Sequence, residues 1–471
     1  MKLKKWFPLL ICFAIPLAVL ALPSQLIPLP ELTLVQHRII AIFLLAALLW
    51  VFEPVPVFAT SLLIITLEVV MLSDQGLQMF VSQQSETPLG TLLPYQDIFA
   101  SFASPIIILF MGGFALAIAA SKYDLDINLA RVLLKPFGNQ VQYVMLGLML
   151  ITAVFSMFMS NTATTVMMLA ILGPIIACAP ENDLGAKGLV LAIPIAANTG
   201  GIATPIGTPP NAIALQYLPE GAVSFAQWMM VGLPFVCVQL AIAWFLLRYL
   251  YPSKNKHMEL KLAGQFLHSP KAWVVYITFV ATIIMWLTTQ LHGMNSYVVA
   301  IIPLAVFTLT GVITKQDLKL INWDVLWLVA GGIAMGMALD KSGLAVKLAN
   351  SLNFADMGVW LVIISLSLTC YAMANFMSNT ATANLIMPIA AAVATTMSSG
   401  EVAGQSELGL IPILVVVAFS ASLGMVLPVS TPPNALAYST GFIATKDLLK
   451  TGIIVGGTGL TLMYLTLLFI I

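Results

Sequence analysis

Phe-Met-Ser-Asn-Thr-Ala-Thr at positions 158–164 recurs letter for letter at positions 376–382. A second pair of strings follows these copies, Pro-Ile-Gly-Thr-Pro-Pro-Asn-Ala at 205–212 and Pro-Val-Ser-Thr-Pro-Pro-Asn-Ala at 428–435. The third match precedes the copies and is a Gly-Gly pair, found at 112–113 and 331–332. Because the three matches keep their order and nearly constant spacing, they indicate an internal duplication.

The rest of the chain is strongly apolar. Of its 471 residues 60% are hydrophobic and only 8% are charged, 19 Lys and Arg balance 19 Asp and Glu, and the mean hydropathy is +1.01. A soluble domain carries about 25% charged residues, so this composition excludes a water-soluble enzyme. The lack of a basic excess argues against binding to nucleic acid. The sequence therefore predicts an all-α polytopic protein of the lipid bilayer.

Apolar runs of about 20 residues suffice to cross the hydrocarbon core and predict about 11 transmembrane helices. They lie near 7–28, 37–52, 56–73, 101–121, 189–218, 226–251, 271–291, 296–314, 323–340, 409–440 and 447–470. Two further stretches, 141–179 and 357–396, are interrupted at their centres by the Ser-Asn-Thr clusters and predict re-entrant hairpins. We expect an N-terminal anchor helix within 1–36, a first repeat over 37–252 and a second over 253–471.

The distribution of basic residues predicts the orientation. With the Lys-rich N-terminus in the cytoplasm, Lys and Arg lie at or near cytoplasmic ends except Arg38, Lys341 and Lys347. The two Gly-Gly segments then cross the membrane in opposite directions. The repeats are therefore predicted to be inverted, which is typical of secondary transporters.

Thr208-Pro209-Pro210 and Thr431-Pro432-Pro433 each lie within an apolar run. Two consecutive prolines remove two amide donors and clash with the preceding turn, so a helix must break there. The carbonyls that a break exposes are tolerated at membrane depth only inside protein or beside a wet cavity. The sequence therefore predicts broken helices over 189–218 and 409–440.

Each Ser-Asn-Thr cluster should form the tip of its hairpin, near the membrane midplane. Carbonyls there, with the side-chain oxygen of Asn161 or Asn379, suit a small cation such as sodium, whereas amides and hydroxyls at helix N-termini suit a carboxylate. Two copies predict about two sodium sites or more, and a substrate with two negative ends. The alternative is a duplicated structural unit whose polar residues only cap helices.

Other features bear on the driving force. No phosphate-binding loop occurs, which argues against ATP as the energy source, and no ladder of acidic residues suggests a proton relay. Glu68 lies in an apolar run and is the exception; it is expected to be paired or to face lipid headgroups, and the alternative is a coupling residue. The stretches 122–135 and 340–352 are predicted to be amphipathic helices on opposite membrane surfaces.

The paired clusters resemble those of the divalent anion/sodium symporter family, over about residues 35–471. The resemblance implies sodium-coupled import of C4 dicarboxylates (succinate, malate or fumarate), a homodimer, an elevator motion and the bacterial cytoplasmic membrane. It implies substrate contacts at Ser160, Asn161, Thr162, Thr208, Ser378, Asn379, Thr380, Thr431 and Pro432. It also implies a first sodium site at Ser156, Ser160, Asn161 and Gly207, and a second at Ala374, Met377, Asn379 and Ser430.

Several alternatives remain open at this point. The same fold could carry citrate or sulfate, or exchange dicarboxylates without sodium. An anion channel is a different class of function, and saturable counterflow would exclude it. An intramembrane hydrolase is disfavoured because the apolar runs contain no paired catalytic Asp, Ser/His pair or metal ligands.

Overall fold

The computed structural model describes residues 3–27, 29, 31–82, 87–176, 183–219, 221–253, 265–351, 358–399 and 410–470. Within these ranges the chain is built from helices, and the only pairing of β type is an isolated bridge between Ser73 and Leu93. Nine of the described helices are long and apolar enough to cross a membrane, and shorter apolar helices accompany them. The predicted all-α polytopic fold is therefore confirmed.

The helices fall into two series that follow the predicted repeats. The first series is α1 (Leu3–Ala21), α2 (Leu34–Phe52), α3 (Val57–Leu72), α4 (Gln78–Val81), α5 (Tyr95–Ala100), α6 (Pro105–Lys122), α7 (Leu125–Leu134), α8 (Val141–Phe158), α9 (Asn161–Ile176), α10 (Leu184–Gly200), α11 (Pro209–Gln216) and α12 (Phe225–Leu250). The second series is α13 (Pro270–Leu287), α14 (Thr289–His292), α15 (Ser296–Leu309), α16 (Trp323–Lys341), α17 (Leu344–Ser351), α18 (Val359–Ala374), α19 (Asn379–Ser399), α20 (Leu410–Ser422), α21 (Pro432–Ser439) and α22 (Thr445–Ile470).

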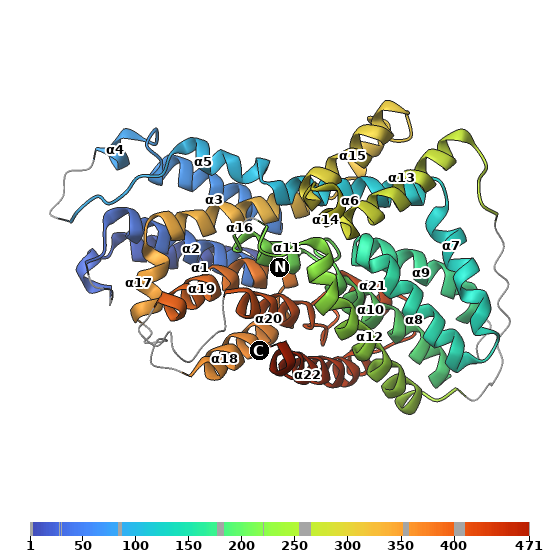
Figure 1. Cartoon of the computed structure of the whole chain (residues 1–471). Helices are drawn as coiled ribbons and strands as arrows, with labels where there is room; N and C mark the ends of the chain where they lie inside the picture. The colour runs from blue at the N-terminus through green and yellow to red at the C-terminus, as the bar shows by residue number, and fades with distance from the viewer. Residues whose placement is uncertain are drawn as a thin grey trace.

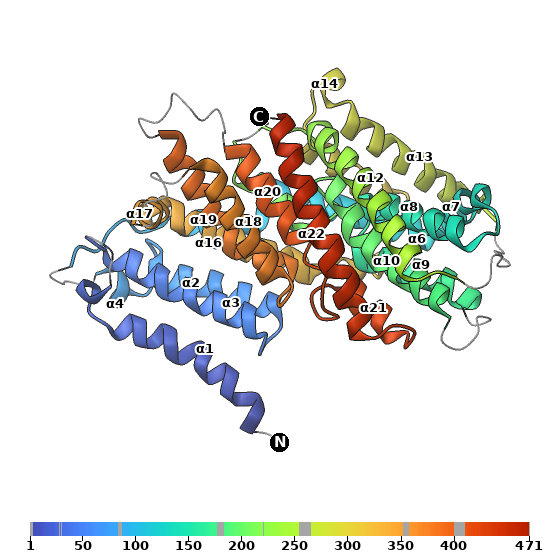
Figure 2. The same cartoon turned by 90° about the horizontal axis from the view of Figure 1, so that it is seen from below.

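Each series divides between two layers (Figure 1). We call α1–α6 and α13–α16 the frame helices, which lie in the upper part of Figure 1 and at its left. We call α8–α12 and α18–α22 the core helices, which lie below them. Helix α7 at the right and α17 at the left lead from one layer to the other, and α7 packs on α8 as α17 packs on α19. The view from below shows α22 running across the core helices (Figure 2).

Each stretch predicted as a hairpin or a broken helix forms a pair of consecutive helices. Stretch 141–179 forms α8 and α9, and 357–396 forms α18 and α19; residues 177–179 and 357 lie outside the described ranges. Stretch 189–218 forms α10 and α11 with a 3₁₀ turn at Gly201–Ala203, and 409–440 forms α20 and α21, with residue 409 not described. In both breaks the prolines begin the second half-helix rather than interrupt it, because Pro is tolerated at the first helical position.

Two related ion pairs join the ends of frame helices. Lys122 at the end of α6 pairs with Asp317 before α16, and its repeat counterpart Lys341 at the end of α16 pairs with Asp97 in α5. Burial alone would raise the pKa of Asp317, but hydrogen bonds from Lys122 and Thr314 outweigh it and lower the pKa to about 2. Equivalent ion pairs therefore hold the ends of α6 and α16, from which the chain continues into α7 and α17.

The Gly-Gly pairs lie where the two layers meet. The first glycine of each pair touches a frame helix, since Gly112 packs on Ala300 and Gly331 packs on Ser61. The second glycine faces the core side, against Ile206 and Asn384 respectively. Because most of these neighbours lie too close for an added Cβ, the glycines allow α6 and α16 to contact both layers closely.

Candidate functional site

The two repeats pack against each other in the region of the Ser-Asn-Thr and Thr-Pro-Pro strings. Helix α9 of the first repeat packs against α21 of the second, and α19 packs against α11. The Asn198 amide on α10 donates to Thr431 Oγ1 at 3.0 Å and to Asn434 Oδ1 at 3.3 Å. The helix following each Ser-Asn-Thr tip thus packs on the short half-helix that the other repeat's Thr-Pro-Pro begins.

The serine of each Ser-Asn-Thr cluster caps the helix that follows it. Ser160 Oγ accepts from the Ala163 amide and Ser378 Oγ accepts from the Ala381 amide, both at 3.2 Å. The side chain of a serine at this position satisfies an amide that would otherwise have no partner. The capping interpretation therefore accounts for the two serine side chains, and leaves the asparagines and threonines to be explained.

Two asparagines that were not predicted from the sequence donate hydrogen bonds to main-chain carbonyls where the two broken helices are interrupted. Asn211 Nδ2 lies 3.0 Å from Gly201 O, 3.2 Å from Ile202 O and 2.8 Å from Thr204 O. Asn434 Nδ2 donates in the same way to Met425 O at 2.8 Å and Leu427 O at 3.0 Å. The signal was available, because an Asn directly follows both Thr-Pro-Pro strings.

Replacing Asn211 by alanine should lower the free energy of unfolding by about 1–3 kcal/mol, because buried carbonyls lose their donor. The thermal or denaturant unfolding of the purified protein in detergent measures this loss. Gln96→Ala removes an exposed amide and is the matched control. Equal stabilities of the Asn211→Ala and Gln96→Ala variants would contradict the role of Asn211.

Three of the residues predicted for the first sodium site, Ser156, Asn161 and Gly207, place oxygen atoms close together. A Cβ atom added to Gly207 would lie 2.5 Å from Gly201 O and 2.9 Å from Ser156 O. One added to Gly201 would lie 2.7 Å from Asn161 Oδ1 and 3.0 Å from Gly207 O. Ser156 Oγ also donates to Ala197 O at 2.7 Å. This donor set consists of neutral carbonyl, amide and hydroxyl oxygens, the ligands that hard cations prefer.

The Asn161 amide has two possible orientations among these oxygen atoms. One of its terminal atoms lies 2.5 Å from Ser156 Oγ, 3.1 Å from Gly207 O and 3.3 Å from Ala197 O. With nitrogen at this position the amide donates to the oxygens around it. With oxygen at this position Ser156 Oγ donates to it, and the Gly207 and Ala197 carbonyl oxygens lie beside it, so a cation bound among them would offset their repulsion.

The residues predicted for the second sodium site are arranged differently. Asn379 Oδ1 is buried and has no hydrogen-bond partner among the described residues. Ser430 is buried, and its hydroxyl donates to Leu427 O at 2.7 Å. Ala374 and Met377 are buried and could contribute only backbone carbonyls. The unpartnered Asn379 oxygen fits a cation, but Ser430 carries a side chain at the position where the first half has Gly207.

Further buried polar atoms near the clusters lack partners within the described part of the chain. They include a pair of repeat counterparts, the Thr164 and Thr382 hydroxyls one turn after the tips, which the sequence reasoning missed. The side-chain oxygens of Asn198 and Asn211 also lack partners. Since buried polar groups are normally hydrogen-bonded, these oxygens, which are free of partners among the described residues, are available to a ligand.

The predicted substrate contacts differ in exposure. Thr162 and Pro432 are exposed, Ser160, Asn161, Ser378, Asn379 and Thr380 are half-buried, and Thr208 and Thr431 are buried. Thr431 Oγ1 caps α21 by accepting a hydrogen bond from the backbone N–H of Asn434 at 3.3 Å, whereas the Thr208 side chain makes no capping bond.

The second half is also the more open of the two. Val429 is 75% exposed, while its counterpart Ile206 is 7% exposed. Phe376 at the second tip is 76% exposed, whereas its counterpart Phe158 is half-buried.

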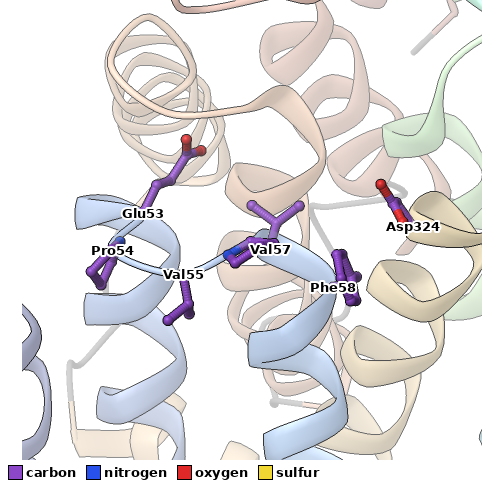
Figure 3. Close-up of a pocket in the computed structure, with 7 residues that line it drawn as sticks. Glu53, Pro54, Val55, Val57, Phe58 and Asp324 are labelled. Atoms are coloured by element: carbon purple, nitrogen blue, oxygen red, sulfur yellow. The ribbon is translucent and has the colours of Figure 1, made fainter.

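A separate cavity of about 440 Å³ lies between the α2–α3 turn and the start of α16 (Figure 3). It contains none of the predicted site residues, and its two acidic side chains, Glu53 and Asp324, are exposed.

The prediction for Glu68 is wrong. Its side chain is buried in α3 with 0% exposure, so it does not face lipid headgroups. Both carboxyl oxygens lack a hydrogen-bond partner among the described residues, so the acid is not paired either.

Comparisons with known proteins agree with this architecture. A family model described as "Citrate transporter" matches residues 47–405. The chain is 31% identical over 457 residues to the sodium-dependent dicarboxylate transporter SdcS of Staphylococcus aureus (strain bovine RF122/ET3-1), covering 88% of this chain and 82% of that one. It is 30% identical to SdcS of Staphylococcus saprophyticus, covering 92% and 86% of the two chains.

Another relative is an uncharacterized transporter of Schizosaccharomyces pombe, 29% identical over 89% of this chain but only 48% of its own length. Among solved structures the fold is similar to the YdaH transporter of Alcanivorax borkumensis, with a TM-score of 0.58 at 13% identity over 90% and 98% of the two chains. MtrF of Neisseria gonorrhoeae gives a TM-score of 0.54 at 12% identity over 87% and 94%. The chain therefore belongs to the citrate transporter and divalent anion/sodium symporter family, as a multi-pass secondary transporter and not an enzyme.

Proposed function

We propose that this protein imports C4 dicarboxylates such as succinate, malate or fumarate together with sodium. The observation that carries the proposal is the set of oxygens around Asn161, Gly201 and Gly207, next to the tip of a hairpin. Relatives named sodium-dependent dicarboxylate transporters support the same choice of ion and substrate. The proposed location is the bacterial cytoplasmic membrane, with a cytoplasmic N-terminus.

The proposed sodium ligands form two sets of residues, which we call the first and the second cradle. The first ion would bind at Ser156, Ser160, Asn161 and Gly207. The second would bind at Ala374, Met377, Asn379 and Ser430. Broken helices in transporters commonly offer main-chain carbonyls to coupling cations in this way.

The proposed substrate site uses the N-termini of α9 and α19. These helices have 16 and 21 residues, and each begins at the asparagine of its cluster. A helix N-terminus favours negative charge, so two of them suit a ligand with two carboxylates. Thr162 and Thr380 would add hydroxyl donors, and the two Thr-Pro-Pro breaks would form the floor of the cavity.

Asn161 supplies a physical link between the two ligands. Without sodium, its nitrogen faces the cradle oxygens and its oxygen points away from them. With sodium bound, the amide oxygen turns towards the ion, and the nitrogen turns towards the substrate, where it can donate to a carboxylate. Sodium would therefore convert a group that repels the anion into one that binds it, which is the requirement for symport.

The unequal exposure of the two halves supports alternating access. In an inverted repeat, the two halves exchange arrangements when the site changes the side to which it opens. We propose that the conformation described here is one of the two end states of this exchange. We further propose an elevator motion, in which the core helices slide against the frame helices at the glycine contacts of α6 and α16, within a homodimer.

Uptake of labelled succinate into proteoliposomes, with and without an inward sodium gradient, tests the proposal. We expect saturable uptake that requires sodium, and counterflow when unlabelled succinate is placed inside. Uptake that ignores sodium would refute symport and favour an exchanger. A flux that never saturates would favour a channel.

Citrate is the second candidate substrate, because the matching family model is described as a citrate transporter. Competition by unlabelled succinate, malate, fumarate, citrate and sulfate against labelled succinate separates these ligands. We expect the C4 dicarboxylates to compete most strongly. Stronger competition by citrate would reassign the substrate while leaving the sodium sites in place.

A further inference from the structure

Glu68 is an acid buried within the helix contacts of the frame, far along the chain from the proposed sodium ligands. It lies on the face of α3 that is buried, with Ser61, Ile64 and Ile65. That face packs against α16, where Ser61 meets Gly331. Glu68 is fully buried, and neither of its oxygens has a partner in the described residues.

The surroundings connect Glu68 to the broken helix of the first repeat. Tyr217 directly follows α11, and its hydroxyl fits against Gly336 of α16, where an added Cβ would collide with it. Tyr217 lies within electrostatic range of both Glu68 and Asp340. Glu68 therefore lies close to where the frame helices α3 and α16 meet the end of the core helix α11.

Among the described residues, no hydrogen bond joins Glu68 to a basic side chain. Lys341 pairs with Asp97, Arg38 donates to the Met71 and Phe80 carbonyls, and His37 contacts the Val19 carbonyl. The titratable and charged groups on the elements packed around α3 are His37, Arg38 and Glu53 with α2, Tyr95 and Asp97 on α5, Asp324, Asp340 and Lys341 on α16, and Tyr217 after α11.

The chemistry of the site favours a proton over a metal cation. A buried carboxylate without a partner is far more costly than a buried neutral acid. A sodium ion would need several further oxygen ligands, yet nothing bonds to the Glu68 oxygens, and the described residues contain no metal-binding group of three or more His, Cys, Asp or Glu.

We propose that Glu68 is a proton-binding site, protonated while α3, α16 and α11 are packed as seen here. Ionisation of the acid would require water or a cation to enter this contact. The packed arrangement is therefore favoured at low pH and loses stability as the pH rises. Proton binding at Glu68 would thus make the junction of frame and core sensitive to pH, independently of the sodium ions.

Thermal unfolding of the purified protein in detergent, followed from about pH 5 to about pH 9, tests this site. We expect the midpoint of the wild-type protein to fall by several degrees as the pH rises. Glu68→Gln keeps the shape of the neutral acid and should remove most of this fall. Glu31→Gln, a change at an exposed acid, should keep the wild-type slope. A Glu68→Gln variant with the wild-type slope would overturn the proposal.

Infrared spectroscopy gives a second reading that needs no transport activity. The difference spectrum between the wild-type protein and Glu68→Gln at neutral pH should contain the carbonyl stretch of a protonated carboxylic acid. Its absence would overturn the proposal. If Glu68→Gln does not fold, Glu68→Asp should shift that band, and an unshifted spectrum would count against Glu68. Neither readout depends on uptake. The proposal for Glu68 can therefore fail while sodium-coupled transport stands, and sodium-coupled transport can fail while the proposal for Glu68 stands.

Discussion

Asn161→Ala is expected to lower sodium-stimulated uptake of succinate at least about tenfold, the scale seen when support for a bound ion is removed. The variant removes the only side-chain amide among the first cradle's ligands, and with it the group that would contact the substrate when sodium is bound. Asn379→Ala should have an effect of the same kind, because it removes a buried oxygen that has no partner among the described residues. Uptake in proteoliposomes over a range of sodium concentrations measures both changes.

A second substitution at the same position separates the two roles of the amide. Asn161→Asp keeps an oxygen for sodium but presents a negative oxygen, rather than an N–H, to the substrate. We expect it to retain the thermal stabilisation that NaCl gives over KCl, and to lose succinate uptake. Thr461→Ala, at an exposed hydroxyl on α22, serves as control for both measurements. If both asparagine-to-alanine variants transported like this control, the site assignment would be wrong although the fold would stand.

Gly207→Ser should abolish sodium binding at the first cradle and reduce uptake by a factor of at least about ten. Its Cβ would lie 2.5 Å from Gly201 O and 2.9 Å from Ser156 O, and both atoms belong to the main chain, which cannot move aside cheaply. The new side chain would occupy the space that we propose for the ion. The expected result is a smaller stabilisation by NaCl relative to KCl than in the wild-type protein, because the second site is unchanged, together with loss of uptake.

The second half provides the matched exchange. Ser430 is the counterpart of Gly207, so Ser430→Gly creates space instead of filling it, and we expect it to keep most of the uptake. Gly457→Ala is the control for adding a methyl group to a glycine, because nothing lies within 4 Å of its added Cβ. Sodium-stimulated uptake in Gly207→Ser equal to that in Gly457→Ala would rule out an ion at the first cradle.

The interruptions of the helices at the Ser-Asn-Thr and Thr-Pro-Pro strings were predictable because proline and repeated polar clusters act locally. The exact residue at which each helix ends was not predictable. Pro209 and Pro432 are compatible with the start of a helix, so only the preceding residues decide where α10 and α20 end. The serines illustrate a second limit. Their motif suggests ligands, but it does not show that the Ser160 and Ser378 side chains also cap the helices that follow.

Contacts between the repeats could not be derived from the sequence. The bridge from Asn198 to Thr431 joins positions far apart in the chain, and only the packed structure brings them together. Glu68 shows the same limit for burial. Helix α3 is apolar around most of its circumference, so its sequence does not indicate which face meets α16.

The bridge made by Asn198 has an evolutionary consequence. The position that matches Asn198 in the second half is Ala421, which has no amide, so the contact runs in one direction only. Two identical half-length ancestors, assembled about a true twofold axis, would form both such bridges or neither. The single bridge therefore arose only after the two halves had diverged in sequence from each other.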